Sequence, residues 1–141
     1  MKIYLSYNPN DAAHAAKLRP LLKEEGFEVW DANVHVLPGD NWPKLFDKAL
    51  RESKSMILVV SPMMLKNPFF QREIDYAIGH MQFAHRLFVC FTKPKEELKN
   101  VPWILENKLI HRLNLFPGRV KPVVRKITAI LHEQSVVAVS A

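Results

Sequence analysis

Apolar and polar positions alternate along the chain in blocks that predict five strands. Residues 2–7 alternate and are rich in β-formers, and the Asn8-Pro9-Asn10-Asp11 cluster that follows breaks this pattern. Residues 55–60 are almost continuously apolar, which is typical of a central parallel strand that is buried on both faces. Shorter apolar segments predict the other strands at residues 27–30, 86–91 and 109–113.

Between the predicted strands, apolar residues recur every three to four positions, which indicates amphipathic helices. The clearest stripe consists of Trp42, Leu45, Phe46, Ala49 and Leu50. A second stripe follows Asn67-Pro68, where Asn suits the helix cap and Pro the first helical position; its members are Phe70, Ile74, Ala77, Ile78 and Met81. Further helices are expected from Asp11 to Glu25, with a kink or restart at Pro20, and after Gly118.

Strands that alternate with helices predict a doubly wound α/β domain. Five strands suit a flavodoxin-like parallel sheet in the order 2-1-3-4-5, flanked by helices. We expect one domain over residues 1–134 and a tail without clear pattern over residues 135–141. Ligands of such sheets bind beyond the carboxyl ends of the strands, and these ends carry Tyr7-Asn8, Trp30-Asp31 and Ser61.

Composition narrows the possible partners. Twenty Lys and Arg against fourteen Asp and Glu give a formal charge of +6. The basic residues are dispersed, which argues against a nucleic-acid groove. No apolar run approaches the ~20 residues that span a bilayer, and the first residues lack a signal peptide, so a cytoplasmic protein is expected. The single cysteine, Cys90, lies in a predicted strand and is interpreted as a buried, inert thiol.

Most motifs with direct chemical meaning are missing. The four glycines form no phosphate-binding loop, and the six histidines lack metal-ligand spacing, so no metal is expected. Ser61 has no nucleophile elbow and is interpreted as a helix cap. On the helix after Asn67, however, Phe69 and Glu73 share a face with Tyr76 and His80. An aromatic ring one turn before a carboxylate suits a base and its ribose, although a solvated glutamate is the simpler interpretation of the spacing alone.

Six segments of the chain form a recognisable series. They are Ile3-Tyr4-Leu5-Ser6-Tyr7 with Asp11, Gly26-Phe27-Glu28-Val29-Trp30-Asp31, Leu37-Pro38-Gly39-Asp40-Asn41-Trp42, Ala49-Leu50-Arg51-Glu52-Ser53, Ile57-Leu58-Val59-Val60-Ser61-Pro62, and Asn67-Pro68-Phe69-Phe70-Gln71-Arg72-Glu73-Ile74. In this order they resemble the successive motifs of the Toll/interleukin-1 receptor (TIR) domain family. The resemblance extends over residues 1 to about 92 and is less specific beyond them.

The resemblance implies an activity and a site. Enzymatic members of the family, many of them bacterial and active in antiviral defence signalling, cleave the nicotinamide–ribose bond of NAD+ to give ADP-ribose or a cyclic isomer. Their catalytic glutamate, in a W-x-x-x-E motif, corresponds to Glu73, and Phe69 stands where tryptophan is usual. The resemblance further implies that Tyr7, Asn8, Asp31 and Trp42 contribute to substrate binding. NAD+ would be the substrate, and no separate cofactor is implied.

Two other functions remain open at this level. A non-catalytic TIR module would act by self-association through the loop from Asp31 to Trp42, as the adaptors of the family do. A nucleoside deoxyribosyltransferase-like enzyme would share the architecture and use a glutamate of its own, although the Pro38-Gly39-Asp40 loop is of the TIR type. The resemblance also implies contacts between TIR domains and a downstream sensor of any nucleotide product.

Overall fold

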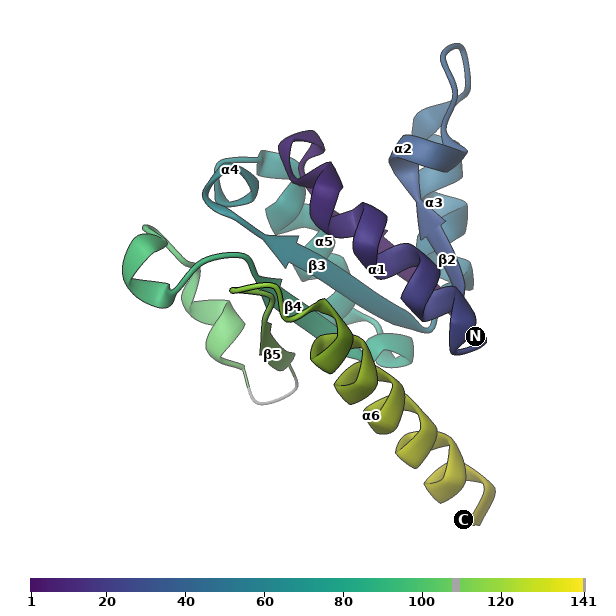
Figure 1. Ribbon diagram of the computed structural model, residues 1–141. Helices are drawn as coiled ribbons and strands as arrows, with labels where there is room; N and C mark the ends of the chain where they lie inside the picture. Colours follow the sequence, from purple (N-terminus) through teal and green to yellow (C-terminus); the bar gives the residue numbers. More distant parts are fainter. Residues whose placement is uncertain (108–109, 141) are drawn as a thin grey trace.

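The computed structural model describes residues 1–107 and 110–140 and contains a five-stranded, all-parallel sheet (Figure 1). The strands are β1 (Lys2–Ser6), β2 (Glu28–Asp31), β3 (Ser55–Val60), β4 (Leu87–Phe91) and β5 (Ile110–Asn114). Their order is β2-β1-β3-β4-β5, so the predicted doubly wound topology is confirmed. Each strand lies within one residue of its predicted position, except that Leu109 of the fifth prediction lies outside the described residues.

Helices cover both faces of the sheet. The helices α1 (Ala12–Glu24) and α6 (Val120–Ser140) pack over one face, on which the side chains of Ile3 and Leu5 lie. The other face carries α3 (Trp42–Glu52), α4 (Pro62–Leu65) and α5 (Pro68–Gly79). A short helix, α2 (Ala32–His35), follows β2. Single 3-10 turns complete the described structure: η1 (Pro9–Asp11), η2 (Met81–Phe83), η3 (Lys95–Glu97) and η4 (Trp103–Glu106).

The burial pattern follows from the strand and helix periods. All six residues of β3 are buried, as expected for the central strand of a parallel sheet. On β1 the alternation places Tyr4 on the α5 side of the sheet, opposite its neighbours Ile3 and Leu5. Ser6, two residues after Tyr4, lies on that same side. This alternation brings a hydroxyl group under α5 at the carboxyl end of the strand.

Several predicted details differ from the structure. The helix does not restart at Pro20; α1 is continuous, and both Pro20 and Ala16 are exposed, so water can solvate the Ala16 carbonyl that lacks its helical partner. In the second stripe, Phe70, Ile74 and Ala77 are buried, but Ile78 is 37% exposed; the side chain of Met81 lies outside the described residues.

The start of the α3 stripe and the end of the last helix also differ from the prediction. Trp42, first in the stripe of α3, is 51% exposed, because α3 begins there and only its later turns face the sheet. The final helix α6 continues to Ser140, through most of the segment expected to be a tail, and Ala141 lies outside the described residues. No helix in the described part of the chain is long and apolar enough to cross a membrane.

Candidate functional site

The helix α5 carries a carboxyl group into the interior. Asn67 caps the helix, since its Oδ1 accepts the backbone N–H of Phe69 at 2.9 Å, and Pro68 occupies the first helical position. This cap fixes where the helix begins, and burial of the apolar stripe turns Phe70 and Ile74 into the core. Glu73, at the side of this apolar stripe, is only 3% exposed. A plain solvated glutamate, the simplest sequence interpretation, is therefore excluded.

The surroundings of Glu73 are polar on one side only. Ser6 Oγ donates a 2.6 Å hydrogen bond to Glu73 Oε1. Glu73 Oε2 and the Tyr4 hydroxyl are buried, and neither makes a hydrogen bond of normal geometry among the described residues, but the Tyr4 hydroxyl lies close enough to favour the charged carboxylate. Burial raises the pKa of Glu73 to about 7, and the hydroxyl groups of Ser6 and Tyr4 oppose this rise. The carboxyl group is thus held between its neutral and charged forms near neutral pH.

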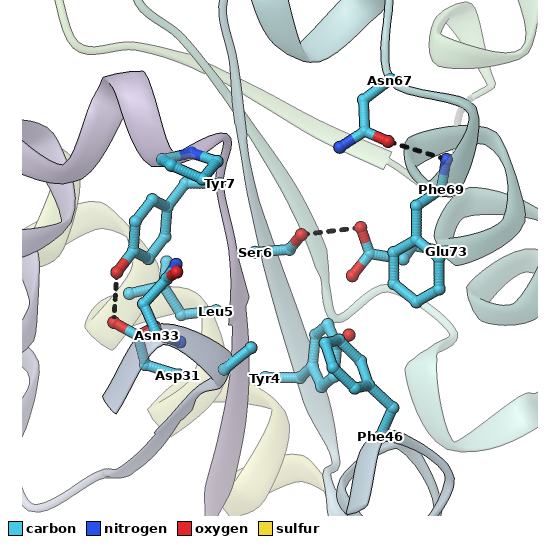
Figure 2. A pocket seen from close by; sticks show the side chains of 12 residues that line it. Tyr4, Leu5, Ser6, Tyr7, Asp31, Asn33, Phe46, Asn67, Phe69 and Glu73 are labelled. Atoms are coloured by element: carbon cyan, nitrogen blue, oxygen red, sulfur yellow. Dashed lines mark hydrogen bonds between the residues drawn. The ribbon is translucent and has the colours of Figure 1, made fainter. Parts of the chain in front are cut away.

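Glu73 borders a cavity of about 220 Å³ at the carboxyl ends of β1 and β2. In Figure 2, Glu73, Phe69 and Asn67 lie on one side of the cavity, opposite Tyr7 and Asp31. The complete lining is Tyr4, Leu5, Ser6, Tyr7, Pro9, Asp31, Ala32, Asn33, Phe46, Asn67, Phe69 and Glu73. This lining contains two acidic residues, four aromatic rings and no lysine or arginine. Such a cavity suits an aromatic ring that carries a positive charge.

Aromatic rings connect the floor of the cavity to the protein surface. The Phe46 ring packs edge-to-face on Phe69, with centroids 5.2 Å apart, and also contacts Tyr4 and Trp30. Trp42 contacts Phe46 and Phe69 edge-to-face, at 5.8 and 6.4 Å, but does not itself line the cavity. The predicted stacking residue Phe69 is therefore held by α3, and Trp42 supports it from outside.

Asp31 forms the opposite wall and is fully buried. Its Oδ2 accepts hydrogen bonds from Tyr7 Oη, at 2.8 Å, and from Arg19, and its Oδ1 caps α2 through the N–H of Asn33 at 2.9 Å. Burial and the neighbouring Asp31 raise the pKa of Tyr7. Since both oxygens of Asp31 have protein partners, this side chain holds the wall in place and fixes the start of the loop from Asp31 to Trp42.

The structure thus gathers some of the predicted site residues and separates others. Glu73, Phe69, Tyr7 and Asp31 line one cavity. Asn8 lies outside its lining, and its side chain caps η1 by accepting the N–H of Asn10 at 3.1 Å. Tyr76 and His80, on the same predicted face as Glu73, instead stack on each other with centroids 3.7 Å apart, away from the cavity.

Four residues that shape the site, Ser6, Tyr4, Arg19 and Phe46, were not among the site residues predicted from the sequence. Ser6 and Tyr4 could have been found from the two-residue period of β1, which turns both toward α5. Arg19 pairs with Asp31 across the fold, and Phe46 reaches the cavity from α3. No local signal in the sequence marks those two long-range contacts.

The other candidates for chemistry have structural partners. Ser61 Oγ accepts the N–H of Met64 at 3.1 Å, which confirms its role as the cap of α4, and donates to Asp11. Cys90 is fully buried, which confirms the buried thiol, and burial raises its pKa to about 12. Among the described residues, no group of three or more His, Cys, Asp and Glu side chains could hold a metal ion.

A second cavity, of about 250 Å³, lies at the carboxyl ends of β4 and β5. Its charged residues, Arg112 and Glu106, pair with each other at 3.2 Å and are largely solvent-exposed. An exposed ion pair of this kind contributes little electrostatic strain or reactivity. Size does not distinguish the two cavities, but the buried carboxyl group of Glu73 does, so we take its cavity as the candidate site.

Comparison with known proteins gives a consistent result. A family model described as TIR domain matches residues 3–116. No curated protein sequence matches the chain. Among solved structures, the TIR domain of the Toll-related receptor TRR-2 from Hydra magnipapillata has 20% sequence identity and a TM-score of 0.69, over 88% of this chain and 91% of that one.

Two further solved structures share the fold. A metazoan TIR-STING receptor from C. gigas, in complex with 2′,3′-cGAMP, has 21% identity and a TM-score of 0.71; the match covers 89% of this chain and 39% of the receptor chain. A prokaryotic SEFIR domain has 10% identity and a TM-score of 0.67, over 92% of this chain and 90% of that one. At these identities the likeness establishes the arrangement of strands and helices alone.

Proposed function

The chain belongs to the TIR domain family, and from that premise we propose that it cleaves the nicotinamide–ribose bond of NAD+ with Glu73 as its catalytic residue. The observation that carries this proposal is the buried Glu73 carboxyl group, 3% exposed, at the edge of an acidic and aromatic cavity. A buried ionisable group with a perturbed pKa in a cavity is a marker of function. This buried group favours an enzyme over a module that works by assembly alone.

The reaction matches what one carboxylate can do. The bond from C1′ of the ribose to the pyridinium nitrogen breaks, and both bonding electrons pass to the nitrogen. Nicotinamide leaves as a neutral molecule, so the reaction needs no general acid. The remaining ribosyl centre is oxocarbenium-like, and a nearby carboxylate stabilises its positive charge. A water oxygen then bonds to C1′ and releases a proton, which gives ADP-ribose; attack by a nitrogen or hydroxyl of the same molecule gives a cyclic isomer.

The cavity accounts for substrate orientation. At about 220 Å³ it is smaller than pockets that enclose a drug-sized ligand, about 300–1,000 Å³, so it can enclose only part of a dinucleotide. The cationic nicotinamide ring and its ribose are the part that suits the Glu73 carboxylate and the faces of Phe69 and Phe46, because the other acidic side chain, Asp31, is already paired with Arg19. The anionic pyrophosphate and the adenosine would remain outside, since the lining has no basic side chain.

A second candidate function rests on a different observation. The loop from Asp31 to Trp42 exposes three large apolar side chains, Val34 at 51%, Leu37 at 63% and Trp42 at 51%. Exposed apolar residues on a projecting loop favour contact with another protein surface. We therefore also propose self-association through this loop, either as the whole function of a non-catalytic module or as a condition for catalysis. If the protein cleaves NAD+, we further propose that its nucleotide product acts in cytoplasmic antiviral signalling and is bound by a downstream sensor.

One experiment separates these functions. The purified protein is incubated with NAD+ and, in parallel, with deoxynucleosides, over a range of protein concentrations, and released nicotinamide or free base is quantified. Release of nicotinamide supports the proposed activity, and release of free base supports the deoxyribosyltransferase-like alternative. Neither product at any concentration, with oligomers present, supports the assembly module. The matched control for Glu73→Gln is Asp75→Asn on the same helix, because Asp75 is exposed and accepts a hydrogen bond from the Gln71 side chain at 3.0 Å.

A further inference from the structure

Ser6 makes a contact that the fold does not require. It is the last residue of β1, and its Oγ lies 2.6 Å from Glu73 Oε1, across 67 residues of sequence. Its hydroxyl bonds neither the backbone nor a helix terminus, unlike Ser61, which caps α4, and Ser53, which bonds the carbonyl of Ala49. The Ser6 hydroxyl is thus directed at the carboxyl group alone (Figure 2).

The contact makes the two carboxyl oxygens unequal. Oε1 accepts the Ser6 hydroxyl, whereas Oε2 is buried and makes no hydrogen bond of normal geometry among the described residues; the Tyr4 hydroxyl lies near the carboxyl group. A hydroxyl hydrogen bond to one oxygen fixes the rotation of the carboxyl plane, because the other oxygen then follows from the fixed geometry of the group. Figure 2 shows both oxygens directed from α5 toward β1, beside the cavity.

We propose that Ser6 is a positioning residue for Glu73, whose hydroxyl holds Oε1 in place and favours the carboxylate at the edge of the cavity. A hydrogen bond donated to the charged form of an acid stabilises that form. The expected effect of Ser6 on turnover rests on the proposed NAD+ cleavage, whereas its expected effect on the ionisation of Glu73 is independent of that activity.

Among the described residues packed around Glu73, hydroxyl groups and not cations stabilise its charged form. From β1, Tyr4 is the ionisable group that interacts with Glu73, and burial and the carboxyl group both raise the pKa of Tyr4, so that it stays neutral. From α3, Asp47 pairs with Arg51 at 2.9 Å, and Lys48 with Glu52 at 3.9 Å, on the outer surface. The residues of β3 and α4 are uncharged. The hydroxyl groups of Ser6 and Tyr4, and not a cation, therefore oppose the rise that burial causes in the pKa of Glu73.

The test compares Ser6→Ala with Ser6→Thr, which keeps the hydroxyl group. The matched control is Ser55→Ala, which removes another buried serine hydroxyl of the sheet; it donates to the carbonyl of Arg86 at 2.9 Å, far from Glu73. The carboxyl resonance of Glu73 is followed by NMR on protein with 13C-labelled glutamate, identified by its loss in Glu73→Gln, while pH is varied. In parallel, kcat and KM for NAD+ are measured at pH 7 and pH 9.

Loss of a hydrogen bond to the charged form should raise the pKa of Glu73 by about one pH unit or more in Ser6→Ala. At pH 7 the ionised fraction would fall from about one half to about one tenth, so kcat should drop about fivefold, and most of this loss should vanish at pH 9. Ser6→Thr and Ser55→Ala should keep the wild-type titration.

Two results would overturn the proposal. One is an unchanged titration of Glu73 in Ser6→Ala. The other is an increase in KM alone, equal at both pH values, which would mean that Ser6 binds the substrate directly. If wild-type protein cleaves no NAD+ but Ser6→Ala still shifts the titration, the proposed activity fails while the positioning role stands.

Discussion

Replacing Glu73 by glutamine should move activity and stability in opposite directions. Glutamine has nearly the same shape, and its carbonyl oxygen can still accept the Ser6 hydroxyl that now bonds Oε1 at 2.6 Å. Only the ability to carry a negative charge is lost. A site residue of this kind works against the stability of the fold, because its charge is stabilising only while the transition state is bound.

The loss of activity follows from the location of the charge. Removing one electrostatic stabiliser of a transition state typically lowers kcat by about 10²–10³. We therefore expect Glu73→Gln to reduce nicotinamide release by at least about a hundredfold, with a smaller change in KM, since the ground state carries less charge at C1′ than the transition state.

The gain in stability follows from the pKa. Burial raises the pKa of Glu73 from 4.5 to about 7, and each pH unit corresponds to about 1.4 kcal/mol. Below pH 4.5 the group is neutral in the folded and unfolded states, so it costs nothing. Between pH 4.5 and 7 the unfolded chain ionises first, and the folded state loses about 3 kcal/mol relative to it. Glu73→Gln should thus be more stable than wild type by up to about 3 kcal/mol at pH 8 and equally stable near pH 4.

The assay is denaturant unfolding of both proteins at pH 4 and pH 8, together with quantification of nicotinamide. Asp75→Asn, an exposed change on the same helix, should alter neither property. Near-normal NAD+ cleavage by Glu73→Gln would refute the catalytic assignment. Equal stabilities of the two proteins at pH 8 would refute the conclusion that burial raises the pKa of Glu73.

Three further predictions concern single residues around the site and the core. Phe69→Ala should raise KM for NAD+ more than it lowers kcat in steady-state kinetics, because the ring offers a stacking face in contact with Phe46 and carries no charge. Asp40→Ala should lower activity more steeply at low protein concentration than at high, since Asp40 Oδ2 holds the loop by accepting the N–H of Leu37 at 2.8 Å; a loss independent of concentration would argue against subunit contacts there. Cys90 should react with a thiol reagent only after unfolding, as its thiol is fully buried; rapid labelling of native protein would contradict this.

The strands and helices could be predicted because their apolar periods are local properties of the sequence. Their strict alternation then predicts the order of the strands in the sheet. The continuous apolar run at residues 55–60 and the alternation at residues 2–7 mark the central strand and its neighbour, and β3 and β1 occupy these positions. Pro20 shows the limit of such reasoning. Its cost depends on whether the Ala16 carbonyl can reach water, and that exposure is decided by how α1 packs on the sheet.

The candidate site was predictable in composition but not in arrangement. The cap at Asn67 and the spacing of Phe70, Ile74 and Ala77 set the rotation of α5, so the side of the helix that carries Glu73 follows from the sequence. Asp31 was expected to contact substrate, but its two oxygens already bond Arg19, Tyr7 and Asn33. Two of these partners, Tyr7 and Arg19, come from other elements of the fold, and no local pattern in the sequence predicts their contact with Asp31.

The burial of Glu73 depends on an agreement between two periods. The 3.6-residue period of α5 turns Glu73 partly toward the sheet, next to the core positions Phe70 and Ile74, and the two-residue period of β1 turns Tyr4 and Ser6 toward the same place. An apolar residue at position 6 would leave the carboxyl group without its hydrogen bond, and the group would then be mostly neutral at pH 7. A basic residue there would keep it ionised but would neutralise the charge that a cationic transition state needs. A hydroxyl group at position 6 avoids both outcomes, because it stabilises the carboxylate by a hydrogen bond and leaves its negative charge unpaired.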